Sequence, residues 1–179
     1  MVDPVTRTRL AHQLLFLAIA AAVVFAQVLP FRIGGGRVPG PDILVLMAFA
    51  WVMRRPDFVP PLLAGGVVLA ADVLFMRPIG LWAALAVAGL EFLRGRSALS
   101  RDLPFLVEWF TVSGVLLLMT LANAAALMLT MVPRAPLGLD FLQLIVSCLS
   151  YPLVVALTAR PFGVGKLAPG EVDALGHRL

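Results

Sequence analysis

The sequence has one cysteine and two histidines, and these shortages exclude several kinds of site. Cys148 lies within an apolar run, so one chain can form neither a disulfide nor a cysteine metal cluster. His12 and His177 lie near the two ends of the chain, and no His-Glu spacing of a zinc-binding helix occurs. The glycine clusters at 34–36 and 163–165 lack the Lys-Ser/Thr ending of a phosphate-binding loop. We therefore expect no catalytic residue, no metal and no cofactor.

Charged residues are also scarce, at 13% of 179 residues, whereas 61% are hydrophobic and the mean hydropathy is +0.99. A soluble core of this length cannot hide so much apolar surface. The sequence therefore predicts an integral membrane protein whose first partner is the lipid bilayer. The net charge of +4 comes almost wholly from arginine, as expected of loops that face anionic headgroups. Nucleic acid is not an expected partner.

Six apolar stretches follow one another, at about 10–28, 43–53, 59–76, 79–93, 103–132 and 141–159. The first, third and last have the roughly 17 to 20 residues of a spanning helix. The second and fourth are short, and the fifth is long enough to tilt or to begin in the interface. Six spans with both chain ends in the cytoplasm place ten of the 14 Lys and Arg residues inside, as cytoplasmic loops require.

The predicted fold is therefore an all-α, polytopic membrane helical bundle of about six transmembrane helices. Residues 1–179 form a single integral membrane domain, with a short cytoplasmic N-terminus at 1–9 and a cytoplasmic tail at 160–179. A signal peptide is the alternative for the first stretch, because Arg7 and Arg9 precede an apolar run that ends in VVFAQ. The run is long and its cleavage site is poor, which favours an uncleaved helix.

The short second stretch has a clear start signal. Asp42 follows Pro41 and can cap a helix, so the second helix is expected to be thin and partly enclosed rather than lipid-facing. Trp51, Trp82 and Trp109 lie toward helix ends, where an amphipathic ring is expected at the headgroup level.

Small residues recur at helical spacing in the third and fourth stretches. In the third stretch Gly66 and Ala70 form one small pair, beside an adjacent stripe of Gly65, Leu69, Asp72 and Met76. In the fourth, Gly80, Ala84 and Ala88 recur every four residues. Small residues let helix backbones approach closely in lipid. We therefore expect the third and fourth helices to form a tight hairpin.

Asp72 is an acid within an apolar run, five residues before Arg77. In one interpretation Asp72 pairs with Arg77 or reaches water near the outer end of its helix. In the other, Asp72 faces a polar cleft or a partner helix, since acids within membranes are candidate functional residues.

Two other acids, Glu91 and Glu108, flank the basic segment 94–101 and are expected to pair with its arginines. Few polar residues are placed near the membrane midplane: Thr120, Asn123, Thr130 and Gln143. A transporter of a charged substrate would need a denser cluster of buried polar groups.

Residues 41–85 carry an ordered set of features: a helix that begins Pro-Asp, an Arg-Pro turn, a Gly-rich helix with one Asp, and a Pro-Ile-Gly turn. The residues that carry them are Pro41, Asp42, Arg55, Pro56, Pro60, Gly65, Asp72, Pro78 and Gly80. This order resembles the bacterial rod shape-determining MreD family, and length and hydropathy agree across nearly the whole chain. Ile79 departs from the leucine that is commoner there, and AADVLF departs from a Gly-Leu-rich lead into the acid.

The resemblance implies a non-enzymatic scaffold of the cell-elongation machinery, which supports lateral peptidoglycan synthesis at the inner membrane. The implied partner is an MreC-like bitopic protein and, through it, MreB, RodA and the partner transpeptidase of RodA. The family's fold is similar to the six-helix substrate-binding subunits of energy-coupling-factor vitamin transporters. A small-molecule (vitamin) binding subunit is therefore the alternative, and a membrane enzyme is the weakest class.

The best-matched segment, the small-residue stripes and the acid within an apolar run all fall on one hairpin, whose tip is expected to be external. The sequence therefore predicts a partner-docking surface there, with these candidates: Asp72, Arg77, Pro78, Gly80, Gly66, Ala70 and Ala84.

The topology can be tested with single cysteines in a Cys148→Ala background. We expect 54–57, 94–101 and the chain after 160 to be cytoplasmic, and 29–41, Arg77 and 133–140 to be external. A membrane-impermeant thiol reagent added to cells with a permeabilised outer membrane should label a cysteine at Gly35 and not one at Ser97. The reverse pattern would contradict the six-span topology.

Overall fold

The computed structural model describes residues 4–29, 39–97, 104–132 and 136–159, and within these ranges it is helical with no strand. The elements are α1 (Pro4–Val28), α2 (Ile43–Arg54), η1 (Pro56–Phe58), α3 (Pro61–Leu74), α4 (Leu81–Ser97), α5 (Phe105–Leu129) and α6 (Leu137–Ala159). The predicted all-α class is confirmed, and the six α-helices of the described ranges follow the six apolar stretches. The predicted tail at 160–179, Arg101 and most of the loop at 29–41 lie outside the described residues.

Three helices are long and apolar enough to cross a membrane: Thr6–Val28, Phe105–Leu129 and Leu137–Thr158. Helices α2 and α3 are apolar but shorter, with 12 and 14 residues. The 17-residue α4 carries Glu91, Arg94 and Arg96 in its second half. These lengths indicate a membrane protein, while the number of complete spans stays a prediction.

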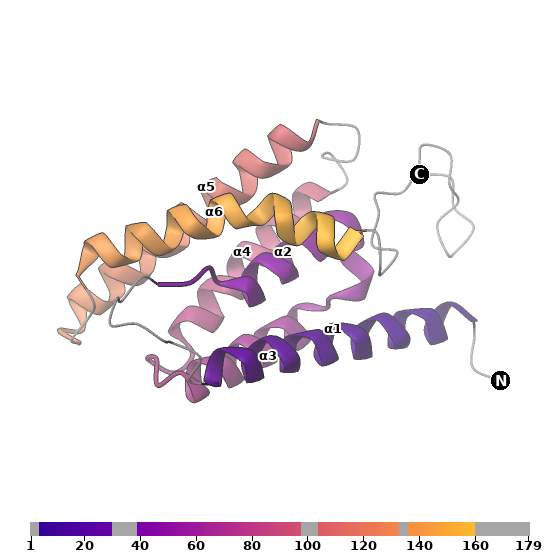
Figure 1. Ribbon diagram of the computed structural model, residues 1–179, viewed down its shortest axis with the longest axis horizontal. Helices are drawn as coiled ribbons and strands as arrows, with labels where there is room; N and C mark the ends of the chain where they lie inside the picture. The colour runs from indigo at the N-terminus through magenta and orange to yellow at the C-terminus, as the bar shows by residue number, and fades with distance from the viewer. Residues whose placement is uncertain (1–3, 30–38, 98–103, 133–135, 160–179) are drawn as a thin grey trace.

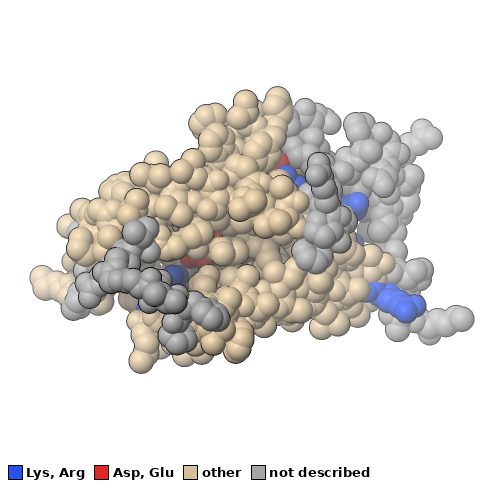
Figure 2. Space-filling model, in the orientation of Figure 1, with Lys and Arg blue, Asp and Glu red and all other residues tan. Residues whose placement is uncertain are grey.

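The helices form layers, with α5 and α6 on one side, α1 and α3 on the other, and α2 and α4 between them (Figure 1). On the face shown in Figure 2, the surface of the described residues is almost wholly uncharged. Acidic residues (red) and basic residues (blue) appear in only a few places on this face. Large apolar side chains such as Phe25, Phe110 and Leu129 are exposed on α1 and α5. A surface of this kind suits lipid better than water.

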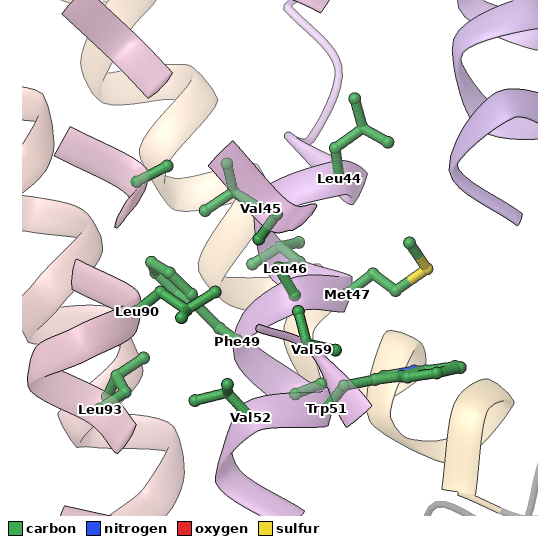
Figure 3. Close-up of a cluster of buried hydrophobic side chains, with 14 of the residues drawn as sticks. Leu44, Val45, Leu46, Met47, Phe49, Trp51, Val52, Val59, Leu90 and Leu93 are labelled. Carbon is green, nitrogen blue, oxygen red and sulfur yellow. The ribbon is translucent and has the colours of Figure 1, made fainter. Parts of the chain in front are cut away.

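Helix α2 is enclosed by its neighbours, and 11 of its 12 residues are buried. Side chains leave it in opposite directions: Trp51 points to one side, while Phe49 points toward Leu90 of α4 (Figure 3). A helix that is apolar all round is buried within a protein or a membrane. The predicted enclosure of α2 is therefore confirmed, and it is more complete than the sequence suggested.

Trp51 does not reach the headgroup level that its place in the sequence predicted. Its side chain is fully buried and makes an edge-to-face contact with Phe16 of α1, with ring centroids 5.5 Å apart. The prediction is wrong because α2 has no outward face, so even its last turn lies in the core.

Helices α3 and α4 pack against each other, as predicted, but through the stripe that contains Gly65 rather than through the Gly66–Ala70 pair. The close approach is at Gly65, where an added Cβ would lie 2.8 Å from Cγ2 of Val87. Gly66 has open space at the same position, and Ala70 and Ala84 are exposed. Successive residues of a helix point about 100° apart, so Gly65 faces α4 while the neighbouring Gly66 faces away from it.

Ser97 is buried and its hydroxyl donates to the carbonyl of Arg94, at 2.8 Å. Gly95 is exposed, with nothing within 4 Å of an added Cβ. A cysteine at Gly95 is therefore the better labelling site for this end of α4.

Candidate functional site

A cavity of about 300 Å³ lies at the end of the bundle where α2 begins. Its polar lining comes from the cap of α2, the α3–α4 turn, α5 and α6: Asp42, Arg77, Thr120, Asn123, Asp140, Gln143 and Ser147. Its apolar lining includes Met76, Trp82, Leu116 and Leu127. A concave site with apolar walls and a few convergent polar groups is typical of ligand pockets.

Asp42 organises this end of α2. Its Oδ1 accepts from the backbone N–H of Val45 at 3.3 Å, which confirms the predicted helix cap. Its Oδ2 accepts from the indole N–H of Trp82 at 2.8 Å and lies 3.5 Å from Nη1 of Arg77. The backbone N–H of Asp42 donates to the hydroxyl of Ser147 at 3.1 Å. One residue therefore joins α2, α4, α6 and the α3–α4 turn.

Arg77 reaches this site because of how α3 ends. Met76 adopts a left-handed conformation with φ of 54°, and the N–H of Arg77 donates to the carbonyl of Asp72 at 2.9 Å. This is the Schellman ending of a helix, in which a left-handed residue turns the chain away. The ion pair that Arg77 makes is with Asp42 rather than with Asp72, so the interpretation in which Asp72 pairs with Arg77 is corrected.

Asp72 is fully buried, and its Oδ2 accepts from the N–H of Ala83 in the first turn of α4, at 3.2 Å. A carboxylate at a helix N-terminus satisfies a free N–H group and opposes the positive end of the helix dipole. Its Oδ1 has no hydrogen bond within the described residues. Asp72 therefore braces the start of α4 from inside and presents no surface to a partner.

The other candidates are divided between the cavity and the outer surface. Pro78 lines the cavity beside Arg77, and Gly80 is half-buried with a positive φ of 85°, which glycine adopts readily. Gly66, Ala70 and Ala84 are exposed.

This end of the bundle is more polar than the sequence indicated. Thr120, Asn123 and Gln143, which are separate in the sequence, converge on the cavity, whereas Thr130 lies outside the lining. The inner face of α6 carries Asp140, Gln143, Ser147 and Tyr151 at spacings of three and four residues. This helical periodicity is the signal that could have revealed one polar face.

A second polar cluster lies at the other end of α2. Nη1 of Arg54 is 2.9 Å from Oε1 of Glu108, and the hydroxyl of Tyr151 donates to the same oxygen at 2.8 Å. The three residues are buried, with exposed fractions of 7%, 0% and 0%. Glu108 therefore pairs with Arg54 of α2 rather than with Arg94 or Arg96, and because Arg101 lies outside the described residues, the expected pairing with Arg101 stays a prediction. The expected local pair of Glu91 with Arg94 is confirmed at 2.9 Å.

Trp109 stabilises α6 near this cluster. Pro152 lies within α6 and has no N–H, so the carbonyl of Cys148 loses its helical partner. The indole N–H of Trp109 donates to that carbonyl at 2.8 Å. Within the described ranges, no three His, Cys, Asp or Glu side chains are grouped as a metal site.

The buried pair predicts a non-additive pattern of stability. Glu108→Leu should lower the free energy of unfolding by about 3 to 5 kcal/mol, because it leaves the Arg54 charge buried without its partner. Adding Arg54→Leu should restore much of the loss, since an apolar pair avoids the cost of burying charge. Thermal unfolding of the purified variants in detergent measures both effects.

Glu91→Ala is the matched control, because the Glu91 side chain is 48% exposed. It should cost less than about 1 kcal/mol. Equal losses for Glu108→Leu and Glu91→Ala, or a double variant no more stable than Glu108→Leu, would contradict the assigned role of the pair.

No protein-family model matches the chain, and neither a curated protein nor a solved structure matches it. A function is therefore proposed from features of the chain itself, among them the α3–α4 hairpin and the cavity.

Proposed function

We propose that the chain is a non-enzymatic, multi-pass scaffold subunit of the bacterial cell-elongation machinery in the inner membrane. The proposal rests on the resemblance of residues 41–85 to the MreD family. In this role the chain binds an MreC-like bitopic protein and supports lateral peptidoglycan synthesis. MreB, RodA and the partner transpeptidase of RodA are reached through that partner.

The observation that carries the proposal is the outward direction of the small residues on the α3–α4 hairpin. Gly66 has open space around an added Cβ, and Ala70 and Ala84 are exposed rather than packed within the bundle. Lipid chains need no such residues, whereas a second helix can bring its backbone close to them. The single transmembrane helix of a bitopic partner suits such a surface.

The interior of the hairpin gives this surface a fixed shape. Asp72 holds the start of α4 through the N–H of Ala83, and Gly65 lets α3 approach Val87. We assign Asp72 as a positioning residue, because its side chain is fully buried. Arg77, whose side chain is 34% exposed, is the polar group at the tip of the hairpin.

A second candidate function is a small-molecule-binding subunit of a membrane transporter. The cavity of about 300 Å³ with seven polar lining residues favours it. Co-purification separates the two functions, since a transporter subunit should carry an energising ATPase and a scaffold should carry a bitopic partner.

If the partner docks on the α3–α4 hairpin, larger side chains on the outer face of the hairpin should release the partner. Ala70→Leu and Ala84→Leu should each reduce recovery of the MreC-like protein from native membranes at least about tenfold, because a larger side chain separates the two backbones. Quantitative mass spectrometry of the affinity-purified chain measures this recovery, and the cells should become round.

Ala122→Leu is the control, because Ala122 is an exposed alanine on α5. It should leave partner recovery and cell shape unchanged. The proposal fails if all three variants recover equal amounts of partner, or if the hairpin variants vanish from the membrane while Ala122→Leu does not.

A further inference from the structure

The cavity beside Asp42 contains charges of both signs. Asp42 and Asp140 contribute carboxylates and Arg77 contributes a guanidinium. An anionic ligand would meet two carboxylates, and a purely cationic one would meet Arg77. A ligand that carries both an ammonium and an anionic group is complementary to a lining that holds charges of both signs.

The ion pair within the cavity is loose. Arg77 lies 3.5 Å from Asp42, whereas the buried Arg54–Glu108 pair is 2.9 Å long. A distance of 3.5 Å is beyond the usual range of a strong charge-assisted hydrogen bond. The Arg77 side chain is 34% exposed, so its remaining donors are accessible to a ligand.

Two amides in the lining have unused hydrogen-bonding capacity. Asn123 of α5 and Gln143 of α6 are half-buried, and neither side chain makes a hydrogen bond within the described residues. Half-buried amides that line a cavity can each offer a carbonyl acceptor and an N–H donor. An ammonium and an anionic oxygen are complementary to these two groups.

The size and the walls limit the ligand further. A volume of about 300 Å³ is at the lower end of small-molecule sites, which span roughly 300 to 1,000 Å³. Met76, Trp82, Leu116 and Leu127 form the apolar part of the wall. The site therefore suits a compact polar group attached to an apolar body.

We propose that this cavity binds a zwitterion in which an ammonium is joined to a nearby phosphate or carboxylate. The anionic group pairs with Arg77, the ammonium lies toward Asp42 and Asp140, and Asn123 and Gln143 supply neutral hydrogen bonds. The ligand is either the headgroup of a zwitterionic phospholipid or a free solute of the same chemistry. This inference does not depend on the proposed scaffold function.

Isothermal titration calorimetry with three probes tests the proposal. The full chain is purified in detergent and stripped of lipid before titration. These are short-chain phosphatidylethanolamine, short-chain phosphatidylglycerol and glycerophosphoethanolamine. We expect saturable 1:1 binding of the phosphatidylethanolamine and at least about tenfold weaker binding of the anionic phosphatidylglycerol. Binding of glycerophosphoethanolamine at similar affinity indicates a free solute, and binding only of the chain-bearing lipid indicates a headgroup site.

Gln143→Leu and Asn123→Leu should each weaken phosphatidylethanolamine binding about tenfold, because each removes hydrogen bonds to a charged group. Neither change leaves a buried partner unsatisfied, so both variants should fold. Gln27→Leu, at an exposed position on α1, is the control and should bind as the unmodified chain does. The proposal is overturned by no saturable binding, by equal binding of both lipids, or by equal affinity of the cavity and control variants.

Discussion

Helix α2 has almost no face left for lipid or water, so the polar groups at both of its ends must find partners inside the protein. Asp42 meets Trp82, Arg77 and Ser147 at one end, and Arg54 meets Glu108 at the other. Unsatisfied polar groups are costly in a membrane interior, where water cannot replace a lost partner. The enclosure of one short helix thus fixes the relative positions of α4, α5, α6 and the α3–α4 turn.

This arrangement places different chemistry at the two ends of the bundle. The Arg54–Glu108 pair is close, buried and shared with Tyr151, which suits a permanent structural tie. The Arg77–Asp42 pair is longer and opens into a cavity, which suits exchange with a ligand. The proposed zwitterion site and the proposed partner surface share the hairpin tip, so a ligand held by Arg77 could influence docking.

Local signals in the sequence were sufficient for the fold class and for the cap on α2. Hydrophobic run lengths predicted six helices, and Pro41 with Asp42 predicted an enclosed short helix. Long-range pairings could not be predicted, because Arg54 and Glu108 meet only when α2 and α5 both pack against α4 and α6. Gly65 and Gly66 are both small, and only the rotation of α3 decides which one faces α4. The cavity was missed because its amides come from separate helices.

The enclosure of α2 should make it the most protected element of the described structure. Hydrogen exchange followed by mass spectrometry, on the chain in lipid nanodiscs, measures this directly. We predict that the amides of α2 exchange more slowly than amides of the other helices at the same depth in the bilayer. Glu108→Leu should accelerate exchange in α2 before it does so in the other helices. Exchange in α2 as fast as in the exposed α1, or unchanged by Glu108→Leu, would contradict the account.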